Sequence, residues 1–373
     1  MKDEYPTGKA DLMTAFMVRG QELTACGGSW AMIDLPSWMS LKSFEVLRRD
    51  LLRTQRIASM VHLGRGVFGS DFGSVAFVID NVAPDPGTTG VYRRLFEQHV
   101  EVRSVATIEK LFRDTDYHRF EVTQADFAAI PGVPIVYWLS EKMRAAFKVG
   151  RPLGEVAELR QGLKTANNDQ FLREWWEVST SRTGFNCSSR ADAERSGARW
   201  FPYNKGGEFR RWYGNQEFVV NWAKDGADIR SFGTGDGGRP KSRVQATEFF
   251  FQPSISWPEV SSGASAFRVF PEGFIFDSTG SSGFTRDDPA RLEALAITNS
   301  SVASAILEAI APGLRFDVGQ IAKVPILEAA AARDDTTNRS EELIFTAQQD
   351  WDSAETSWNF AENSLVARQR TEA

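Results

Sequence analysis

The spacing of apolar residues at positions 11–23 predicts an amphipathic helix. Leu12, Ala15 and Phe16 recur at helical intervals and would form its buried face. Asp11 stands where a side chain can cap the N-terminus of that helix. A pair of glycines a few residues later would end it, because glycine readily takes the left-handed conformation found at helix ends.

The positions that follow alternate between strand and helix patterns. In the helix expected at residues 43–52, the apolar residues would face inward while Arg48 and Arg49 would face solvent. Strand–helix–strand order at this spacing is typical of an α/β sheet with helices packed on it. The strands expected in this part of the chain are 30–35, 57–63 and 74–79.

Beyond position 80 the pattern is less regular. Residues 81–150 are expected to be a connector that opens with the loop NVAPDPGTTG and includes some helix. Short apolar runs, frequent turn residues and many aromatic residues then predict a second, mixed α/β domain at residues 151–327. The polar segment 328–373 is expected to be largely helical, with Trp351 and Trp358 seven positions apart on one helix face.

Composition indicates a folded protein without a membrane span. The 373 residues are 42% hydrophobic and 12% aromatic, and this length suggests two or three domains. No apolar run reaches about 18 residues, and the N-terminus lacks the apolar stretch of a secretory signal. Two widely spaced cysteines fit a reducing cytoplasm, and three scattered histidines form no metal-binding pattern.

The stretch 199–222 mixes aromatic and cationic residues. Residues 199–243 carry nine Lys/Arg and five Asp/Glu, a local excess of positive charge in a chain whose net charge is -6. Cations bind phosphate oxygens and aromatic faces stack on bases, so this stretch predicts a site for a polyanion. A β-rich core with ordinary aromatic pairs is the alternative that the pattern leaves open.

A glycine motif at residues 64–69 has a different explanation from the one its letters suggest. Gly64, Gly66 and Gly69 spell G-x-G-x-x-G after an expected strand, as in dinucleotide-binding proteins. That site requires a helix directly after the glycines, whose N-terminus holds the pyrophosphate. Here SDFGSVAFVI follows, which predicts another strand, so we do not assign a nucleotide site.

A series of motifs, in order, resembles a known family of DNA methyltransferases. The first 80 residues contain DLMTAF, GGSWAMIDLPSWM, FEVLRRDLL and LGRGVFGSDFGSVAFVI, which resemble the second half of an adenine-N6 methyltransferase domain. Farther on come QGLKTANNDQFLREWWEV, WFPYNKGGEFRRWYGNQEFVVNW, FFQPSISW, LRFDVGQIAKVPI and DWDSAETSWNF. Together they resemble the PglX family, the adenine-specific methyltransferases of bacterial BREX phage-defence systems.

The resemblance implies a fold and an activity. The fold would be α/β: a partial class I (Rossmann-like) methyltransferase sheet at 1–80, the connector at 81–150, and a mixed α/β target-recognition domain at 151–327. A helical C-terminal region would begin at 328. The activity would be site-specific adenine-N6 methylation of double-stranded DNA with S-adenosylmethionine as methyl donor, in the company of other BREX proteins.

The chain also departs from the family pattern. Such enzymes use an Asn/Asp-Pro-Pro-Tyr/Phe tetrapeptide to receive the target amine, and no such tetrapeptide occurs among the 373 residues. The glycine-rich loop for the cofactor also precedes the matched region in the family. The resemblance therefore predicts a fragment that is inactive alone and needs the missing N-terminal half. A non-catalytic DNA-recognition module or a decayed gene product is the alternative.

Several residues take candidate roles from this resemblance. Phe68 would stack on a target adenine extruded from the duplex, and Phe16 would pack on the adenine ring of the cofactor. A place in the core is the alternative for both rings. Pro36 and Trp38 would border the pocket with a structural role. No catalytic residue and no metal ligand is expected within the chain.

The candidates for DNA contact lie in the second domain. Asn can pair with adenine in the major groove, while Lys and Arg reach guanine or phosphate. Asn and Asp also favour turns, and cationic loops can simply be solvated, so both alternatives stay open. The candidates are Lys164, Asn167, Asn168, Tyr203, Lys205, Arg210, Arg211, Trp212, Arg239, Lys241 and Arg243.

Overall fold

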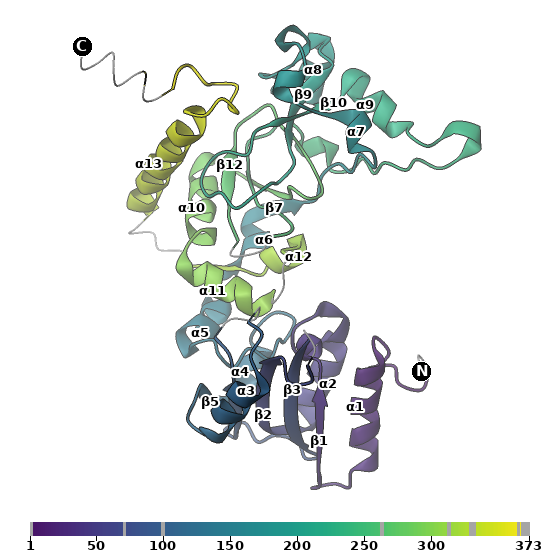
Figure 1. Cartoon of the computed structure of the whole chain (residues 1–373), viewed down its shortest axis with the longest axis vertical. Helices are drawn as coiled ribbons and strands as arrows, with labels where there is room; N and C mark the ends of the chain where they lie inside the picture. The colour runs from purple at the N-terminus through teal and green to yellow at the C-terminus, as the bar shows by residue number, and fades with distance from the viewer. Residues whose placement is uncertain are drawn as a thin grey trace. The chain divides into compact units, whose positions relative to one another are not determined.

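The computed structural model shows a mixed α/β protein with several sheets (Figure 1). It describes residues 3–69, 72–97, 101–261, 265–311, 315–327, 333–363 and 366. The chain divides into two compact units. The N-terminal unit comprises Met1–Val149 and Glu308–Pro312, and the C-terminal unit comprises Gly150–Leu307 and Gly313–Ala373.

The N-terminal unit is built on a five-stranded sheet of order β1-β3-β2-β4-β5. Neighbouring strands are antiparallel except β2 and β4, which are parallel. The strands are β1 (Ser29–Asp34), β2 (Arg56–Arg65), β3 (Gly73–Asp80), β4 (Thr89–Arg94) and β5 (Arg119–Thr123). The helices are α1 (Leu12–Leu23), α2 (Glu45–Thr54), α3 (Val105–Arg113), α4 (Gln124–Ala128) and α5 (Glu141–Val149), with 3-10 turns η1 (Pro36–Met39) and η2 (Lys42–Phe44).

Several expectations for this unit are confirmed. Strands β2 and β3 cover the strands expected at 57–63 and 74–79, and β1 matches the strand expected at 30–35 except for its last residue. Strand β3 is the one expected after the G-x-G-x-x-G motif. The Asp11 side chain caps α1 by accepting a hydrogen bond from the Met13 amide at 3.0 Å. The segment 81–150, expected as a connector, contributes β4 and β5 to this same sheet.

The buried face of α1 differs from the expected one. Thr14, Ala15 and Met17 are buried, whereas Leu12 and Phe16 are exposed. The residues before the helix pack against this side, because the Thr14 hydroxyl donates to the Gly8 carbonyl at 2.8 Å. Tertiary packing therefore turns the helix so that Phe16 points outward, which the apolar spacing alone did not indicate.

The expected outward position of Arg48 is wrong. Its side chain is fully buried and donates to backbone carbonyls that converge from separate segments. Burial lowers the pKa of the Arg48 guanidinium to about 10. The charge is tolerated because carbonyl oxygens surround it. These carbonyls belong to Trp38, Ser40, Leu41, Gly132 and Val133.

The C-terminal unit contains three small sheets. Their strand orders are β13-β9-β10-β8, β12-β11-β14-β7 and β15-β6, and all pairs are antiparallel except β13 with β9. The strands are β6 (Arg151–Pro152), β7 (Ala157–Arg160), β8 (Leu172–Glu174), β9 (Trp200–Asn204), β10 (Phe218–Asn221), β11 (Ser254–Ser256), β12 (Arg268–Phe270), β13 (Ile275–Phe276), β14 (Ser282–Thr285) and β15 (Pro325–Ile326).

Helices of four to 20 residues accompany these strands. They are α6 (Leu153–Val156), α7 (Asn168–Phe171), α8 (Arg190–Ser196), α9 (Ala223–Arg230), α10 (Asp288–Thr298), α11 (Ser301–Ile310), α12 (Val318–Ile321) and α13 (Arg333–Asp352), with α11 divided by the boundary between the units. The 3-10 turns are η3 (Trp175–Glu177), η4 (Thr180–Arg182), η5 (Gly235–Gly237) and η6 (Thr247–Phe249). Within the described part of the chain, no helix is long and apolar enough to cross a bilayer.

Part of the aromatic stretch 199–222 belongs to the core. All five residues of β9 are buried, and Trp222 lies in the same apolar cluster. For these residues the alternative of ordinary core aromatics holds. The C-terminal tryptophans differ from expectation, because α13 ends at Asp352 and Trp358 lies beyond it, packed on the rings of Phe185 and Phe274.

Candidate nucleic-acid interface

Two loops of the C-terminal unit meet and bring separate cationic residues together. Lys164 and Arg243 face each other in an antiparallel bridge, and their backbones exchange two hydrogen bonds of 2.9 Å. The Ser242 hydroxyl adds a bond of 2.6 Å to the Thr165 carbonyl. The side chains of Lys164, Lys241 and Arg243 are exposed. We call residues 162–168 and 231–243 the paired loops.

The second of the paired loops projects from the end of α9 (Figure 1). The Lys241 amide donates to the Phe232 carbonyl at 2.9 Å and holds the base of the projection together. Gly233 has a φ of +85°, and a Cβ there would lie 2.6 Å from the Lys241 side chain. Arg239 is exposed within the same loop. The loop is thus anchored at its base and presents its cations outward.

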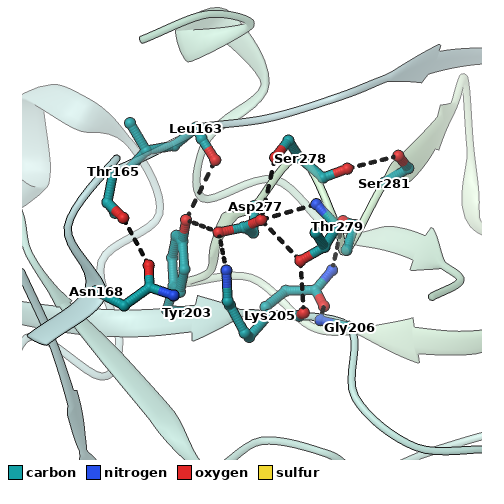
Figure 2. A network of polar contacts seen from close by, with 12 residues as sticks. Leu163, Thr165, Asn168, Tyr203, Lys205, Gly206, Asp277, Ser278, Thr279 and Ser281 are labelled. Atoms are coloured by element: carbon teal, nitrogen blue, oxygen red, sulfur yellow. Dashed lines mark hydrogen bonds and ion pairs between the residues drawn. The ribbon is translucent and has the colours of Figure 1, made fainter. Parts of the chain in front are cut away.

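The two asparagines of the first loop are engaged in a turn. Asn167 caps α7, because its Oδ1 atom accepts from the Gln170 amide at 3.2 Å. The Asn168 Oδ1 atom accepts from the Thr165 hydroxyl at 2.7 Å (Figure 2). A carbonyl oxygen has two lone pairs, and Asn168 is exposed, so its amide can still meet another partner. The turn and a contact with a base are compatible at this position.

Beneath the first loop lies a buried polar network centred on Asp277 (Figure 2). The carboxylate accepts from the Tyr203 hydroxyl at 2.6 Å, from Lys205 Nζ at 2.7 Å, and from the Thr279 amide and hydroxyl at 2.7 and 2.8 Å. The Tyr203 hydroxyl also lies 3.3 Å from the Leu163 carbonyl of the first loop. The network therefore connects this loop to β9 and to Lys205.

Two of the expected contact residues belong to this network. Tyr203 is fully buried, and burial together with Asp277 raises the pKa of its hydroxyl. Its ring has no exposed face for a base, which corrects the expectation of a direct contact: Tyr203 lies beneath the surface rather than on it. Lys205 is ion-paired with Asp277, and only a quarter of its side chain is exposed.

The remaining candidates lie where the chain runs from β9 to β10. Arg210 pairs with Asp350 at 2.9 Å, and its guanidinium lies 5.1 Å from the Trp351 ring of α13. The Arg211 guanidinium lies over the Phe209 ring. Trp212 is half-buried, and its backbone pairs with the strand that begins at Arg268. Arg210 thus contacts α13 through both an ion pair and a ring, and its contact with DNA stays a prediction.

Two buried charges organise these loops and were missed by sequence reasoning. Arg268 donates to the carbonyls of Gly206, Glu208 and Arg210 at 3.0–3.2 Å, and burial lowers its pKa to about 10. Asp277 organises the network described above. The available signal was a single charged residue within or at the end of an apolar run: Arg268 inside FRVF and Asp277 at the end of GFIFD.

In the N-terminal unit, both phenylalanines with expected site roles are exposed. Phe68 follows β2 and is 67% exposed, and Phe16 on α1 is 57% exposed. Neither ring is therefore buried within the described residues. Trp38 is fully buried, which agrees with its expected structural role, and Pro36 opens the turn η1. Among the described residues, no group of acidic, histidine and cysteine side chains could hold a metal ion.

Comparisons with known proteins place these observations in context. The chain is 36% identical over 368 residues to the adenine-specific methyltransferase PglX of Lacticaseibacillus casei (strain Zhang), covering 97% of this chain and 30% of that protein. It is 32% identical over 372 residues to the adenine-specific methyltransferase BrxX of Escherichia coli O9:H4 (strain HS), covering 98% and 29%. The chain thus spans about 30% of the length of these curated relatives. No protein-family model matches it.

The fold also resembles a solved structure. The type IIL restriction-modification enzyme MmeI, solved in complex with DNA, superposes with a TM-score of 0.50 over 96% of this chain and 50% of MmeI. Sequence identity between the two is 11%, so this likeness concerns the fold alone.

Proposed function

This chain is homologous to a segment of the adenine-specific methyltransferases of the PglX type, and we propose that it serves site-specific adenine-N6 methylation of DNA in a BREX phage-defence system. In this proposal the C-terminal unit is the target-recognition domain. The observation that carries it is the meeting of Lys164, Lys241 and Arg243 on the paired loops. Cations gathered from distant parts of an acidic chain suit a phosphate backbone.

The roles within the paired loops divide by chemistry. The cations Lys164, Lys241 and Arg243 would hold phosphate oxygens. Such contacts set the position of the duplex but carry no sequence information. Asn168, exposed beside them, would meet a base edge, since an amide can pair with adenine in the major groove. Lys205 would not contact the DNA as a free cation, because it is paired with Asp277. Its role would be to hold the loop that follows β9 in place.

The N-terminal unit would be the end of a class I methyltransferase sheet. Phe68 would stack on the flipped adenine, and its exposed ring at the end of β2 supports this role. Phe16 would offer an apolar wall to S-adenosylmethionine. In the family pattern, the groups that hold the cofactor's ribose and the target amine precede the matched region. We therefore derive no methyl-transfer step from this chain.

A second candidate is a DNA-recognition module without catalysis of its own. The absence of an Asn/Asp-Pro-Pro-Tyr/Phe tetrapeptide from the 373 residues favours it. Both candidates share the DNA-binding role of the C-terminal unit. They differ in whether methyl transfer appears when the rest of a relative is supplied.

The DNA-binding role is tested by removing the two bridged cations. The double substitution Lys164→Ala and Arg243→Ala should weaken binding to duplex DNA and reduce the slope of log affinity against log salt by about 0.9 for each lost phosphate contact. Binding is measured by fluorescence anisotropy across a salt series. The backbone bridge survives both substitutions, because main-chain atoms alone form it.

A matched control comes from the same unit. Arg182 and Arg195 are also exposed, and Arg182→Ala with Arg195→Ala removes the same charge from elsewhere. This control should leave the salt slope near that of the unchanged chain. An equal reduction of the slope in both double variants would mean that the paired loops are not the interface.

A further inference from the structure

The loop between β9 and β10 presents an aromatic ring at its tip. Phe209 is 55% exposed, although the aromatic residues of β9 just before it are buried. The Arg211 guanidinium lies 5.5 Å from the centre of the Phe209 ring, within the range of a cation–π contact. The loop starts at Lys205, which the Asp277 network ties to the first of the paired loops. We call residues 205–212 the tip loop.

A buried arginine and a half-buried asparagine donate hydrogen bonds to the carbonyls of the tip loop. The fully buried Arg268 donates to the carbonyls of Gly206, Glu208 and Arg210, so alternate carbonyls point inward. The Asn215 amide donates to the Gly206 and Glu208 carbonyls at 3.3 and 2.9 Å. Burying a cation is costly unless it makes hydrogen bonds, and those of Arg268 named here all go to this loop.

The backbone of the tip loop also requires glycine at two positions. Gly206 and Gly207 have φ values of +84° and +96°, which side chains disfavour. A Cβ on Gly206 would lie 2.8 Å from the Thr279 carbonyl oxygen, and one on Gly207 would lie 2.8 Å from Asn215 Nδ2. The loop therefore depends on these two glycines for its backbone conformation, in which the Phe209 ring is exposed to solvent.

We propose that Phe209 is a DNA-stacking residue, whose ring packs as a wedge against the bases of bound duplex DNA with Arg211 behind it. Apolar side chains inserted at base steps unstack them and bend the duplex, which fixes the protein on the DNA. A single exposed ring is ordinary on a protein surface. The Phe209 ring differs from such a residue, because Arg211 lies against it and the buried Arg268 anchors its loop. Little conformational freedom would then be lost when the ring contacts a base. The proposal rests on the DNA-binding role proposed above.

One acidic residue, Glu208, stands beside the Phe209 ring in a loop that is otherwise cationic. Glu208 is exposed next to Phe209 and would repel a phosphate there. The tip loop is therefore suited to the inside of the duplex, whereas the paired loops are suited to its backbone.

The test first selects a ligand and then alters the ring. The 373-residue chain is used to enrich a pool of duplexes with a randomised centre, and the enriched duplex is labelled with 2-aminopurine at successive positions. Phe209→Ala should bind this duplex about tenfold more weakly, in line with the worth of stacking one base. The salt slope should stay unchanged, because no phosphate contact is lost. The rise in 2-aminopurine fluorescence that marks an unstacked step should disappear.

Two further variants make the result specific. Phe209→Leu keeps an apolar wedge and should retain most of the fluorescence change. Phe345→Ala removes an equally exposed ring, 60% exposed on α13, and should behave as the unchanged chain. Binding and fluorescence in Phe209→Ala equal to those of the unchanged chain would overturn the stacking role alone. Failure of the unchanged chain to enrich any duplex would overturn the proposed DNA-binding function and the stacking role with it.

Discussion

Asp277 and Arg268 show how single buried charges shape the surface of the C-terminal unit. Each lies in an otherwise apolar segment and bonds to groups that lead to an exposed loop: Asp277 to Tyr203 and Lys205, Arg268 to the carbonyls of the tip loop. Buried charges persist where their bonds are made. The positions of the exposed candidates for DNA contact thus depend on Asp277 and Arg268, which are buried and would not contact DNA themselves.

The residue-scale prediction concerns Asp277. Asp277→Asn keeps the shape of the side chain but removes the charge that faces Lys205 and Tyr203, so their buried polar atoms lose their strongest partner. We expect the free energy of unfolding to fall by about 1–3 kcal/mol. Urea denaturation followed by circular dichroism measures it.

An exposed carboxylate provides the comparison for Asp277. Asp335 pairs with Arg339 at the surface of α13, and such pairs contribute little to stability. Asp335→Asn should therefore leave the urea midpoint nearly unchanged. If both variants shifted the urea midpoint alike, the Asp277 network would contribute no more to stability than an exposed ion pair does.

At the scale of elements, α13 and the residues after it complete the C-terminal unit. Helix α13 packs on α10 (Figure 1), where the Ser340 hydroxyl lies 3.4 Å from the Leu292 carbonyl. Trp351 lies under the Arg210 guanidinium, and Gly214 leaves room for both, since a Cβ there would lie 2.4 Å from the Arg210 side chain. The helix therefore serves the stability of this unit and occupies Arg210.

The element-scale prediction tests that structural role. Trp351 is buried, so Trp351→Ala should lower the free energy of unfolding by about 3–5 kcal/mol, the usual cost of truncating a buried aromatic side chain. Phe345→Ala on the exposed face of the same helix should cost less than about 0.5 kcal/mol. Urea unfolding followed by far-UV circular dichroism compares them, and similar losses would mean that the buried ring of Trp351 stabilises this unit no more than the exposed ring of Phe345 does.

At the scale of the whole molecule, the N-terminal unit has features of a surface that meets another polypeptide. Strand β1 lies at an edge of the sheet, with β3 as its only partner strand among the described residues. Ile33 on this strand and Leu35 just after it are exposed, as is Phe16 on α1. Edge strands and exposed apolar groups favour pairing with a further chain segment.

The whole-molecule prediction follows from the residues that 1–373 contain. They include no tetrapeptide to receive the target amine, and apolar walls alone cannot align two reacting groups, for which an error of about 1 Å can cost a hundredfold in rate. A polypeptide of these residues should therefore transfer no tritiated methyl group to unmethylated DNA. Adding the part of the Lacticaseibacillus casei relative that this chain does not match should restore transfer.

The outcomes separate the proposed functions. Transfer by the 373-residue polypeptide alone would show that it holds catalytic groups that we did not assign. Transfer only on mixing supports the methyltransferase role, and Phe68→Ala should then lower it because the flipped base loses its stacking partner. No transfer in the mixture, with DNA binding retained, would favour the recognition module.

Local order along the chain was readable from the sequence. The cap at Asp11, the helix after it and the strands around residues 57–63 and 74–79 follow from short-range periodicity and turn chemistry. The order of motifs also predicted a resemblance to adenine-specific methyltransferases, and the chain is 36% identical over 368 residues to one of them. The excess of cations in 199–243 pointed to the C-terminal unit, although several aromatic residues there proved to be core.

Other features were decided only by tertiary structure, because they join residues that no local spacing relates. Strands β4 and β5 acquire their place by pairing in a sheet whose other strands precede them. Arg48 is buried because carbonyls from a distant segment reach it. Lys164 meets Arg243 through a backbone bridge, and Asp277 draws in Lys205. Periodicity tells which side of an element is apolar, but which polar groups are buried depends on the partners that folding brings to them.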